Sequence, residues 1–526
     1  MSRASVWQPS PELMVQTNLH RFMMEVNRFH SLDLQSYQDL WQWSVEKTTR
    51  FWPLIWQYCG VQGSLGDIVA ENRQEMARAR WFPDSRLNFA ENLLRRNDDS
   101  TAIIAYNEQG ERRALSWQQL ESAVASLATW LRAEHVGPGD RVAAYLPNTP
   151  ETVIAMLATA SVGAIWTAID PQLNEQETLH RLTPLSPVVL FACDPSQQSG
   201  QSLTVRDRLI SLRQALPSLR HAVSVSRSDD SLPDWTNWQS LLQTAQPPLR
   251  FYECAFNDPL YISHRNFQGE TVGVIHPVGG SLLQYLKEHQ LHCDIRPGDR
   301  ILCHSKAGEM LWYWQISALA SGATLVLYDG APVHPDNPIL WDIARDEQVT
   351  LLASHSDYFM ALEHGSVRPR LTHQLPYLRL VCSSGTRLDN PHSEHLQRYI
   401  KTDLQLVQLL ECDDIGSCFA LCNPISPLFH GESQGRALGM AVQVLDDTGQ
   451  AVQEGRGWLV CSKPFPAQPL GFWNDPAGER FQAAYFERFA PRWCHGEQVT
   501  LTHTGGVLRH RPPAASDQLR LKPLAS

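Results

Sequence analysis

Two short polar segments carry the side chains best suited to chemistry. The first, Glu411-Cys412-Asp413-Asp414, places three carboxylates within four positions. Carboxylate oxygens are ligands that hard cations such as Mg²⁺ prefer, so this segment is suited to hold one. A solvated acidic turn explains the same residues equally well, because neighbouring carboxylates oppose an anionic ligand unless a cation neutralises them.

The second segment is Ser383-Ser384-Gly385-Thr386, which consists of small residues only. Such a string is, by itself, typical of a turn. It directly follows the segment 378–382, LRLVC, which is predicted to be a strand. That position favours a binding role over a simple turn.

A sequence repeat indicates which elements position these segments. The string 137–141, GPGDR, returns as RPGDR at 296–300, and Gly163 in SVGA returns as Gly322 in ASGA. Both pairs of landmarks are separated by the same offset of 159 positions, which indicates duplicated architecture. Each copy has the order helix, Pro-Gly turn, strand, helix and strand, which predicts βαβ units with parallel sheets.

The first copy shows this order clearly. Val124, Leu127 and Leu131 fall on one helical face, and 141–146 is an apolar strand after the turn. The second copy runs from 281 to 328. Parallel sheets present ligand crevices at the carboxyl ends of their strands, so both polar segments are sought there.

Length and composition exclude several classes of protein. A chain of 526 residues exceeds one hydrophobic core, and 43% hydrophobic with 19% charged residues is typical of soluble α/β proteins. The net charge of −11 argues against nucleic acid or an anionic membrane surface as the default partner. The first residues lack the apolar core of a signal peptide, so we expect a cytoplasmic protein.

The eleven cysteines show no disulfide framework and predict reduced thiols, with Cys412, Cys418 and Cys422 as packing residues. The segment 152–169 carries no charge and approaches membrane-spanning length. It contains several polar residues and has no basic flank. We therefore predict a buried helix followed by a strand, and no membrane span.

From about Phe51 to Gly506 the sequence resembles the acetoacetyl-CoA synthetases, a family of the acyl-adenylate-forming superfamily. At the start, the resemblance is carried by the Trp-rich strings FWPLIWQYCGV (51–61) and RWFPDSRLNFAENLL (80–94). It continues in GATLVLYDGAP (322–332), CSSGTRL (382–388), GESQGRALG (431–439) and PLGFWNDPAGERF (469–481). The resemblance implies activation of acetoacetate by ATP as an acyl-adenylate, with release of pyrophosphate and transfer of the acyl group to CoA. ATP, Mg²⁺ and CoA are the ligands it implies.

The resemblance places the phosphate loop at 257–280, where the family has Tyr-Ser-Ser-Gly-Thr-Thr-Gly and a later lysine. Tyr261 and Ser263 match, but the glycines and the lysine do not, and Glu270 would repel phosphate. Arg265 can replace them through a bidentate phosphate contact. A surface loop freed from this role is the reading that the substitutions favour.

The resemblance also implies roles for other residues. Ser384, Gly385 and Thr386 match the segment against which the adenine lies, and Asp414 matches the acid that helps to hold magnesium. Glu497, in the segment His-Gly-Glu, matches the acid that binds the ribose hydroxyls. No catalytic residue is assigned.

The acyl pocket of the family corresponds to 308–312, where Glu309 would disfavour an anionic acid and 310–312 reads as the core of a buried helix. After Gly506 no Gly-Arg-x-Asp hinge follows, Pro512-Pro513 breaks regular structure, and Lys522 has no domain to hold it. The sequence therefore predicts that the C-terminal lid is absent.

The predicted fold is α/β: the large N-terminal domain of the acyl-adenylate-forming fold, with two duplicated βαβ-type subdomains and a smaller β-rich subdomain. The expected parts are a helical, Trp-rich entry region at 1–95, α/β subdomains at 96–255 and 256–425, a β-rich subdomain at 426–506 and an irregular tail at 507–526.

These substitutions favour a degenerate homologue with weak or no ligase activity. One alternative is an active acetoacetate–CoA ligase that takes a small-molecule acid, ATP and CoA. Another is a non-catalytic ligand-binding or scaffolding protein, with a protein partner or a homo-oligomeric assembly.

Overall fold

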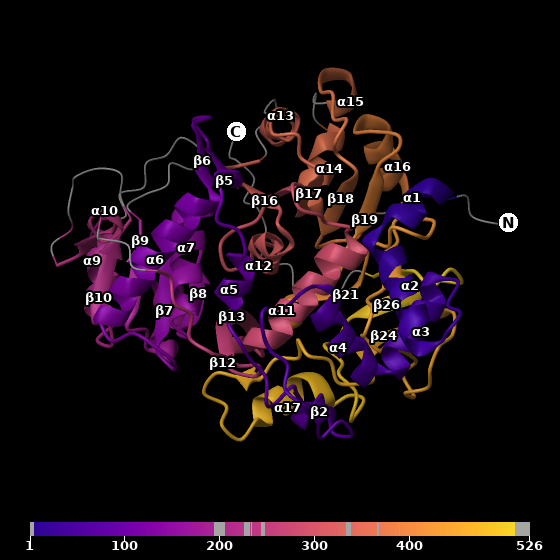
Figure 1. Ribbon diagram of the computed structural model, residues 1–526, viewed down its shortest axis with the longest axis horizontal. Coiled ribbons are helices and arrows are strands. Elements are labelled where there is room, and N and C mark those ends of the chain that lie inside the picture. Colours follow the sequence, from indigo (N-terminus) through magenta and orange to yellow (C-terminus); the bar gives the residue numbers. More distant parts are fainter. Residues whose placement is uncertain are drawn as a thin grey trace.

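Two large β-sheets form the framework of the molecule (Figure 1). The computed structural model describes residues 5–193, 206–225, 232, 234–243, 248–332, 338–364, 368–388 and 390–510. The first sheet has the order β11 (Thr236–Asn237), β10 (His221–Ser224), β9 (Val189–Ala192), β7 (Arg141–Tyr145), β8 (Ile165–Ile169), β13 (Pro259–Phe267), β14 (Glu270–Pro277) and β25 (Gly471–Phe472). The second has the order β19 (Gln405–Gln408), β18 (Leu380–Ser384), β17 (Leu351–His355), β15 (Arg300–Cys303), β16 (Thr324–Asp329), β5 (Thr101–Asn107) and β6 (Arg112–Ser116).

The offset of 159 residues recurs in the pairing of the strands. Parallel pairing aligns Arg141 with Ile165 in β7 and β8, and Arg300 with Thr324 in β15 and β16. The turns before these strands are also alike. Asp140 accepts a hydrogen bond from the Gly137 N–H at 3.1 Å, and Asp299 accepts one from the Arg296 N–H at 2.8 Å. Both copies therefore close the same turn and begin the same parallel ladder.

The helices of the two copies bring the sheets together. In the first copy these are α6 (Trp117–Ala133) and α7 (Pro150–Ser161), and in the second α11 (Val278–Lys287) and α12 (Met310–Ser317). The short helix α5 (Phe89–Leu93) contacts both α7 and α11. All residues of α11 and α12 are buried, as are nearly all of α7, and Figure 1 shows α11 and α12 at the centre of the molecule.

The strands cross the subdomain boundaries expected from the sequence. β5 and β6 lie before position 255 but pair through β16 with the second sheet, while β13 and β14 lie after it and pair through β8 with the first. The order of strands in the chain suggests that consecutive strands pair with one another. In the folded protein, a strand pairs with a sheet edge that is still open. The two sheets therefore exchange strands.

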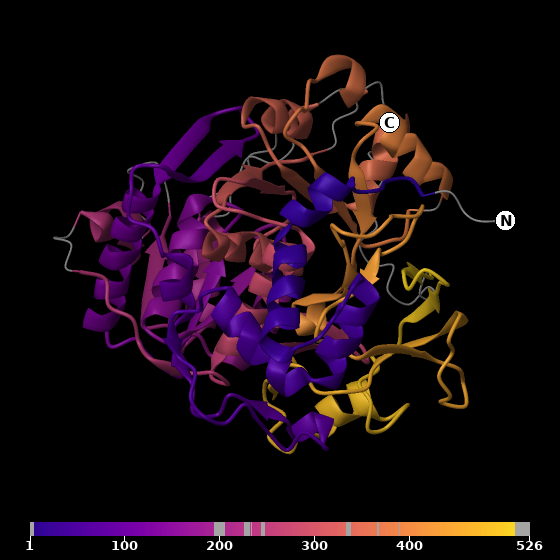
Figure 2. The same ribbon diagram turned by 45° about the vertical axis from the view of Figure 1, so that its right-hand side comes forward.

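Four helices begin the described chain: α1 (Pro11–Gln16), α2 (Asn18–His30), α3 (Tyr37–Glu46) and α4 (Thr48–Tyr58). Helix α3 starts in a capping box, because the Ser36 and Asp39 side chains each bond the other residue's backbone N–H. Gly439 has a φ of 73°, and a Cβ there would lie 2.5 Å from the Phe51 ring. The aromatic face of α4 thus packs directly on the backbone. Figure 2 shows these indigo helices in front of the central part of the molecule.

Two smaller sheets complete the site region. One is β20 (Leu410–Cys412), β21 (Ser417–Leu421) and β22 (Gly435–Arg436), and the other is β23 (Val442–Leu445), β24 (Gly455–Cys461), β26 (Gln498–Leu501) and β27 (Val507–Arg509). The prediction of an irregular tail from 507 is wrong at its start, because Val507 pairs with Leu501 in an antiparallel ladder. Pro512, Pro513 and Lys522, on which the predicted loss of the lid rests, lie outside the described residues.

The remaining elements are shorter. The helices are α8 (Glu175–Leu182), α9 (Arg206–Ala215), α10 (Trp238–Leu242), α13 (Ile339–Asp346), α14 (Ser356–His364), α15 (Pro369–Thr372), α16 (Asn390–Tyr399), α17 (Glu479–Phe486) and the single turns η1 (Met76–Arg78), η2 (Thr183–Leu185), η3 (Glu288–His292), η4 (Ala318–Ser321) and η5 (Asp413–Ile415). The strands are β1 (Gly63–Ser64), β2 (Ala70–Glu71), β3 (Arg80–Trp81), β4 (Arg86–Leu87) and β12 (Cys254–Ala255).

The uncharged segment 152–169 forms most of α7 and the strand β8, and most of it is buried, which confirms the predicted helix and strand. In the described part of the chain, no helix has the length and apolar character needed to cross a membrane.

Candidate adenylate site

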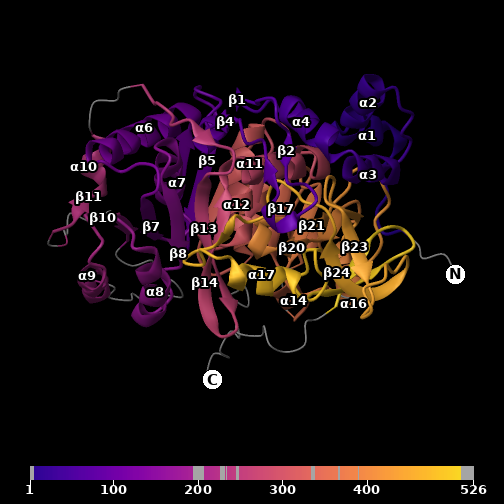
Figure 3. The same ribbon diagram turned by 90° about the horizontal axis from the view of Figure 1, so that it is seen from below.

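The segment expected as the phosphate loop is a regular β-hairpin, visible at the lower centre of Figure 3 as β13 and β14. Antiparallel pairing continues from Tyr261 opposite His276 to Phe267 opposite Glu270. Only Gln268 and Gly269, with φ of 53° and 85°, form the turn at the tip. The prediction of an unconstrained surface loop is wrong, because the ladder fixes which side chains of β13 face the protein.

Ser263 lies within this hairpin and bonds to it. Its hydroxyl is 2.8 Å from Nε2 of His276 on the opposite strand. Burial lowers the pKa of His276 to about 3, so the imidazole is neutral at physiological pH. Tyr261 is fully enclosed and stacks between the rings of His276 and Tyr313, at 4.2 and 3.9 Å. Both matched residues of the loop thus have structural contacts.

Arg265 points from β13 to the acidic segment. Its Nη1 donates to Oδ2 of Asp414 and, at 2.7 Å, to the hydroxyl of Tyr485 on α17. Burial acts to lower the pKa of Arg265, and Asp414 and Tyr485 outweigh it, so the guanidinium keeps its charge. No described residue accepts from Nε or Nη2, and 23% of the side chain is exposed. Two nitrogens of Arg265 therefore have no hydrogen-bond partner in the described part of the chain.

The acidic segment is largely neutralised inside the protein. Asp414 pairs with Arg265, and Glu411 pairs with Arg509 at 2.8 Å. Asp413 is the most exposed of the three carboxylates, although protein atoms surround it on most sides. Crowding by surrounding protein and the nearby carboxylates, foremost Glu411, raise its pKa to about 7. The alternative of a solvated acidic turn thus describes Asp413 only.

A metal site of protein ligands alone is not formed here. Among the residues that the structure describes, no three His, Cys, Asp or Glu side chains are grouped to hold a metal ion. Asp414 uses Oδ2 for Arg265, and no described group donates to its Oδ1. That oxygen is the one atom of the predicted metal residue that remains suited to a cation.

Gly385 and Thr386 follow the carboxyl end of β18, and Ser384 is its last residue. Gly385 has a φ of 83°, and its N–H donates to Oε1 of Glu411 at 2.7 Å. The Ser384 hydroxyl is buried and has no partner among the described residues. The sequence thus correctly expected a glycine turn at a strand end, where parallel sheets bind ligands.

Glu497 precedes β26 and lies at the same place. Its carboxylate accepts from Nε of Arg509 and from Nε2 of His495 at 3.2 Å. Burial acts to raise the pKa of Glu497, but Arg509 and His495 outweigh it and hold the pKa below its usual value. Arg509 also donates to the Gly385 carbonyl at 2.7 Å, so it links the predicted adenine and ribose residues.

Arg509 and Tyr485 are site residues that the sequence did not indicate. Arg509 falls in the segment expected to be an irregular tail, and Tyr485 in a stretch with no motif. Tyr485 contacts Arg265, and Arg509 contacts Gly385 and Glu411, which are all far away in the chain. No local sequence pattern predicts such contacts.

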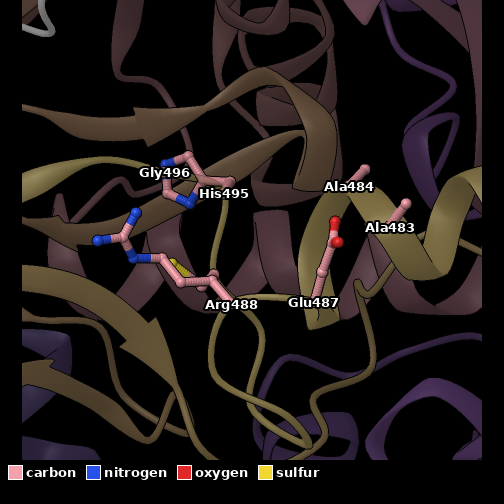
Figure 4. A pocket seen from close by; sticks show the side chains of 7 residues that line it. Ala483, Ala484, Glu487, Arg488, His495 and Gly496 are labelled. Atoms are coloured by element: carbon pink, nitrogen blue, oxygen red, sulfur yellow. The ribbon is translucent and has the colours of Figure 1, made fainter. Parts of the chain in front are cut away.

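Beside the site, α17 and the chain before β26 enclose a hollow of about 320 Å³ (Figure 4). Figure 4 shows Arg488 and His495 on one side of it and Glu487 on the other. Its lining is Ala483, Ala484, Glu487, Arg488, Cys494, His495 and Gly496. His495 is shared, since its Nε2 faces Glu497.

The region expected to receive the acid is tightly packed. All residues of α12 are buried, which confirms the core interpretation of Met310, Leu311 and Trp312. Glu309 immediately precedes this helix, and its Oε2 accepts from the Lys306 N–H at 2.9 Å. The three clustered cysteines are buried and free, as predicted for packing residues.

Comparison with known proteins gives a consistent result. The family model described as "AMP-binding enzyme" matches residues 89–468, and that described as "Acetyl-coenzyme A synthetase N-terminus" matches 37–93. The chain is 38% identical to acetoacetyl-coenzyme A synthetase of Rhizobium meliloti (strain 1021), over 96% of this chain and 79% of that protein. It is 35% identical to acetoacetyl-CoA synthetase of Gallus gallus, over 97% and 78%.

A solved structure agrees with these relatives. Acetoacetyl-CoA synthetase from Streptomyces lividans superposes with a TM-score of 0.92 at 33% identity, over 96% of this chain and 80% of that one. The match confirms the mixed α/β fold of the acyl-adenylate-forming enzymes. The chain belongs to the acetoacetyl-CoA synthetase family of the AMP-binding superfamily.

Proposed function

We propose that this protein is an ATP-dependent acid–CoA ligase that converts acetoacetate, ATP and CoA into acetoacetyl-CoA, AMP and pyrophosphate. One observation carries the proposal: Arg265 is held by Asp414 and Tyr485 through a single nitrogen, while no described residue accepts from its other nitrogens. This arrangement supports a bidentate contact between Arg265 and phosphate, and so an active ligase rather than a degenerate homologue. The close relationship to acetoacetyl-CoA synthetases supports acetoacetate as the acid.

At the phosphate end, the Arg265 guanidinium supplies a fixed positive charge where Nε and Nη2 can donate to two phosphate oxygens. Because Asp414 and Tyr485 hold the side chain before the ligand arrives, little side-chain entropy is lost on binding. Mg²⁺ fits beside Oδ1 of Asp414 and would offset phosphate charge there.

At the nucleoside end, Gly385 and Thr386 leave a side-chain-poor surface against which adenine can lie. Glu497 is ionised and lies beside them, which suits it to accept hydrogen bonds from ribose hydroxyls. CoA is the second substrate of the proposed reaction, and its contacts are not assigned to individual residues.

The proposal is tested by acetoacetate-dependent exchange of labelled pyrophosphate into ATP. We expect exchange by the wild type, and a loss of at least about tenfold in Arg265→Ala, since a charge-assisted phosphate contact contributes at least ~1.4 kcal/mol. Arg78→Ala is the control, because Arg78 is exposed and, among the described residues, pairs with the exposed Glu75 at 3.2 Å. No exchange by folded wild-type protein would refute ligase activity.

A second candidate is a homologue that binds a nucleotide without turnover. The observation in its favour is the continuous ladder from Tyr261 to Phe267 of β13, which engages backbone groups that a glycine loop would turn toward phosphate. This candidate predicts that Mg-ATP raises the melting temperature while pyrophosphate exchange stays absent. The two measurements together separate it from an active ligase.

A further inference from the structure

The Arg509 guanidinium is fully engaged in hydrogen bonds. Its Nε donates to Oε1 of Glu497, and Nη1 donates to the Gly385 carbonyl at 2.7 Å and to Oε1 of Glu411 at 2.8 Å. Its Nη2 donates to the Glu411 carbonyl at 2.8 Å and makes a longer contact of 3.5 Å to Oε2 of Glu497. Since a guanidinium has five N–H donors, none is left for a ligand.

Arg509 joins three segments that are far apart in the chain. It extends from β27, next to the strand β26 that follows Glu497, and reaches the turn after β18 and the end of β20. Only 10% of its side chain is exposed, and its two carboxylate partners are each 12% exposed. The contact therefore fixes the small four-stranded sheet against the carboxyl edge of the second large sheet.

Displacement of Arg509 by a nucleoside is unfavourable. It would leave Glu411 and Glu497 as neighbouring carboxylates with little access to water, and a neutral adenine or ribose cannot compensate their charge. Coulombic attraction to both carboxylates raises the pKa of Arg509 against the effect of burial, so its charge is constant over the whole physiological range. Arg509 thus stays in place when a ligand binds.

We propose that Arg509 is a positioning residue that sets the recognition of the nucleotide's sugar by holding the Glu497 carboxylate at a fixed place relative to Gly385. This inference rests on the proposed function. A carboxylate has about four acceptor sites, and Arg509 and His495 leave Glu497 with capacity for a ribose hydroxyl. A shift of about 1 Å in such a group can cost as much as a hundredfold in an orientation-dependent step.

The test compares the dissociation constants of Mg-ATP and Mg-2′-deoxy-ATP, measured by calorimetry on the purified full chain. We expect the wild type to prefer ATP, and Arg509→Lys, which keeps the charge but loses the fork, to reduce the ratio of the two constants at least about fivefold. Arg456→Lys is the matched control, since Arg456 lies exposed on the same sheet and, within the described residues, bonds the Gln498 side chain alone.

A second variant guards against simple unfolding. Arg509→Met combined with Glu411→Gln removes the cation and one of its carboxylates, so less uncompensated charge remains. We expect this protein to melt cooperatively and to bind both nucleotides with nearly equal affinity. A merely structural role would weaken both nucleotides equally and keep the ratio, and that outcome would overturn the inference.

The outcomes also separate this inference from the proposed function. If the wild type binds ATP and the Arg509 variants keep its preference for the ribose sugar, only the inference about Arg509 is contradicted, and the proposed function stands. Folded wild-type protein that binds neither nucleotide refutes the ligase proposal, and the inference about Arg509 falls with it.

Discussion

Arg265 and Asp414 form an ion pair across 149 residues of chain, and this pair joins the hairpin of the first sheet to the acidic segment. The sequence resemblance predicts a phosphate-loop position for Arg265 and a magnesium-binding position for Asp414. The substitutions in the expected phosphate loop and the carboxylates of the acidic segment must therefore be interpreted together. Together they supply both signs of charge that a magnesium–nucleotide complex requires.

Asp414→Asn is expected to reduce the dependence of ATP binding on magnesium. Removal of the carboxylate frees Arg265 and lowers the repulsion of ATP without metal, so metal-free ATP should bind several-fold more tightly. Mg-ATP should bind less tightly, because a neutral amide oxygen replaces the charged carboxylate of Asp414 as a ligand. Calorimetric titration with and without Mg²⁺ measures both constants. An unchanged stimulation by Mg²⁺ would show that Asp414 takes no part.

Asp413 is expected to make the folded protein less stable as the pH rises. Its pKa of about 7 lies above the usual value near 4, so the native state holds a proton that the unfolded state has released. Stability from this group is present below about pH 4 and is lost progressively up to about pH 7. The melting temperature of Asp413→Asn minus that of the wild type should increase from pH 5 to pH 8. A constant difference would contradict the raised pKa.

Lys287→Met is expected to destabilise the fold strongly. The Lys287 and Glu288 side chains are completely buried, with 3.9 Å between Nζ and Oε1, so loss of the lysine leaves an uncompensated carboxylate in the core. Breaking such a pair costs about 3–5 kcal/mol. Urea unfolding measures the free energy. The control is Arg345→Ala, at an exposed pair with Asp346, where a change of no more than about 1 kcal/mol is expected.

Gly439→Ala is expected to disturb the packing of the N-terminal helices. The residue needs both a positive φ of 73° and room that the Phe51 ring already occupies. We expect a loss of about 2–4 kcal/mol from backbone strain and overpacking together. Gly110→Ala is the control, because its φ of 76° is similar but nothing lies within 4 Å of the added Cβ. Equal losses in the two variants would assign the whole effect to the backbone.

The sequence predicted most of the architecture, because the repeat at 159 residues marks turns and strands whose formation depends on local residues. It placed Gly385 at a strand end for the same reason. The sequence did not predict the partners of Arg265 and Arg509. Neither the register of a strand nor a distant acceptor can be inferred from the residue type of a charged side chain. The phosphate segment was misread because glycine loss suggested a loop, whereas its alternating buried residues form a ladder.

The exchange of strands between the sheets has a consequence for biosynthesis. The edge of β16 is filled by β5, which is made much earlier in synthesis, and the edge of β8 must wait for β13, which is made much later. Neither half can complete its hydrogen bonding while the other is still on the ribosome. Contacts of such high sequence separation slow folding and leave open edges exposed in the nascent chain. A chain cut near position 255 should thus yield two insoluble fragments that become soluble when they are coexpressed.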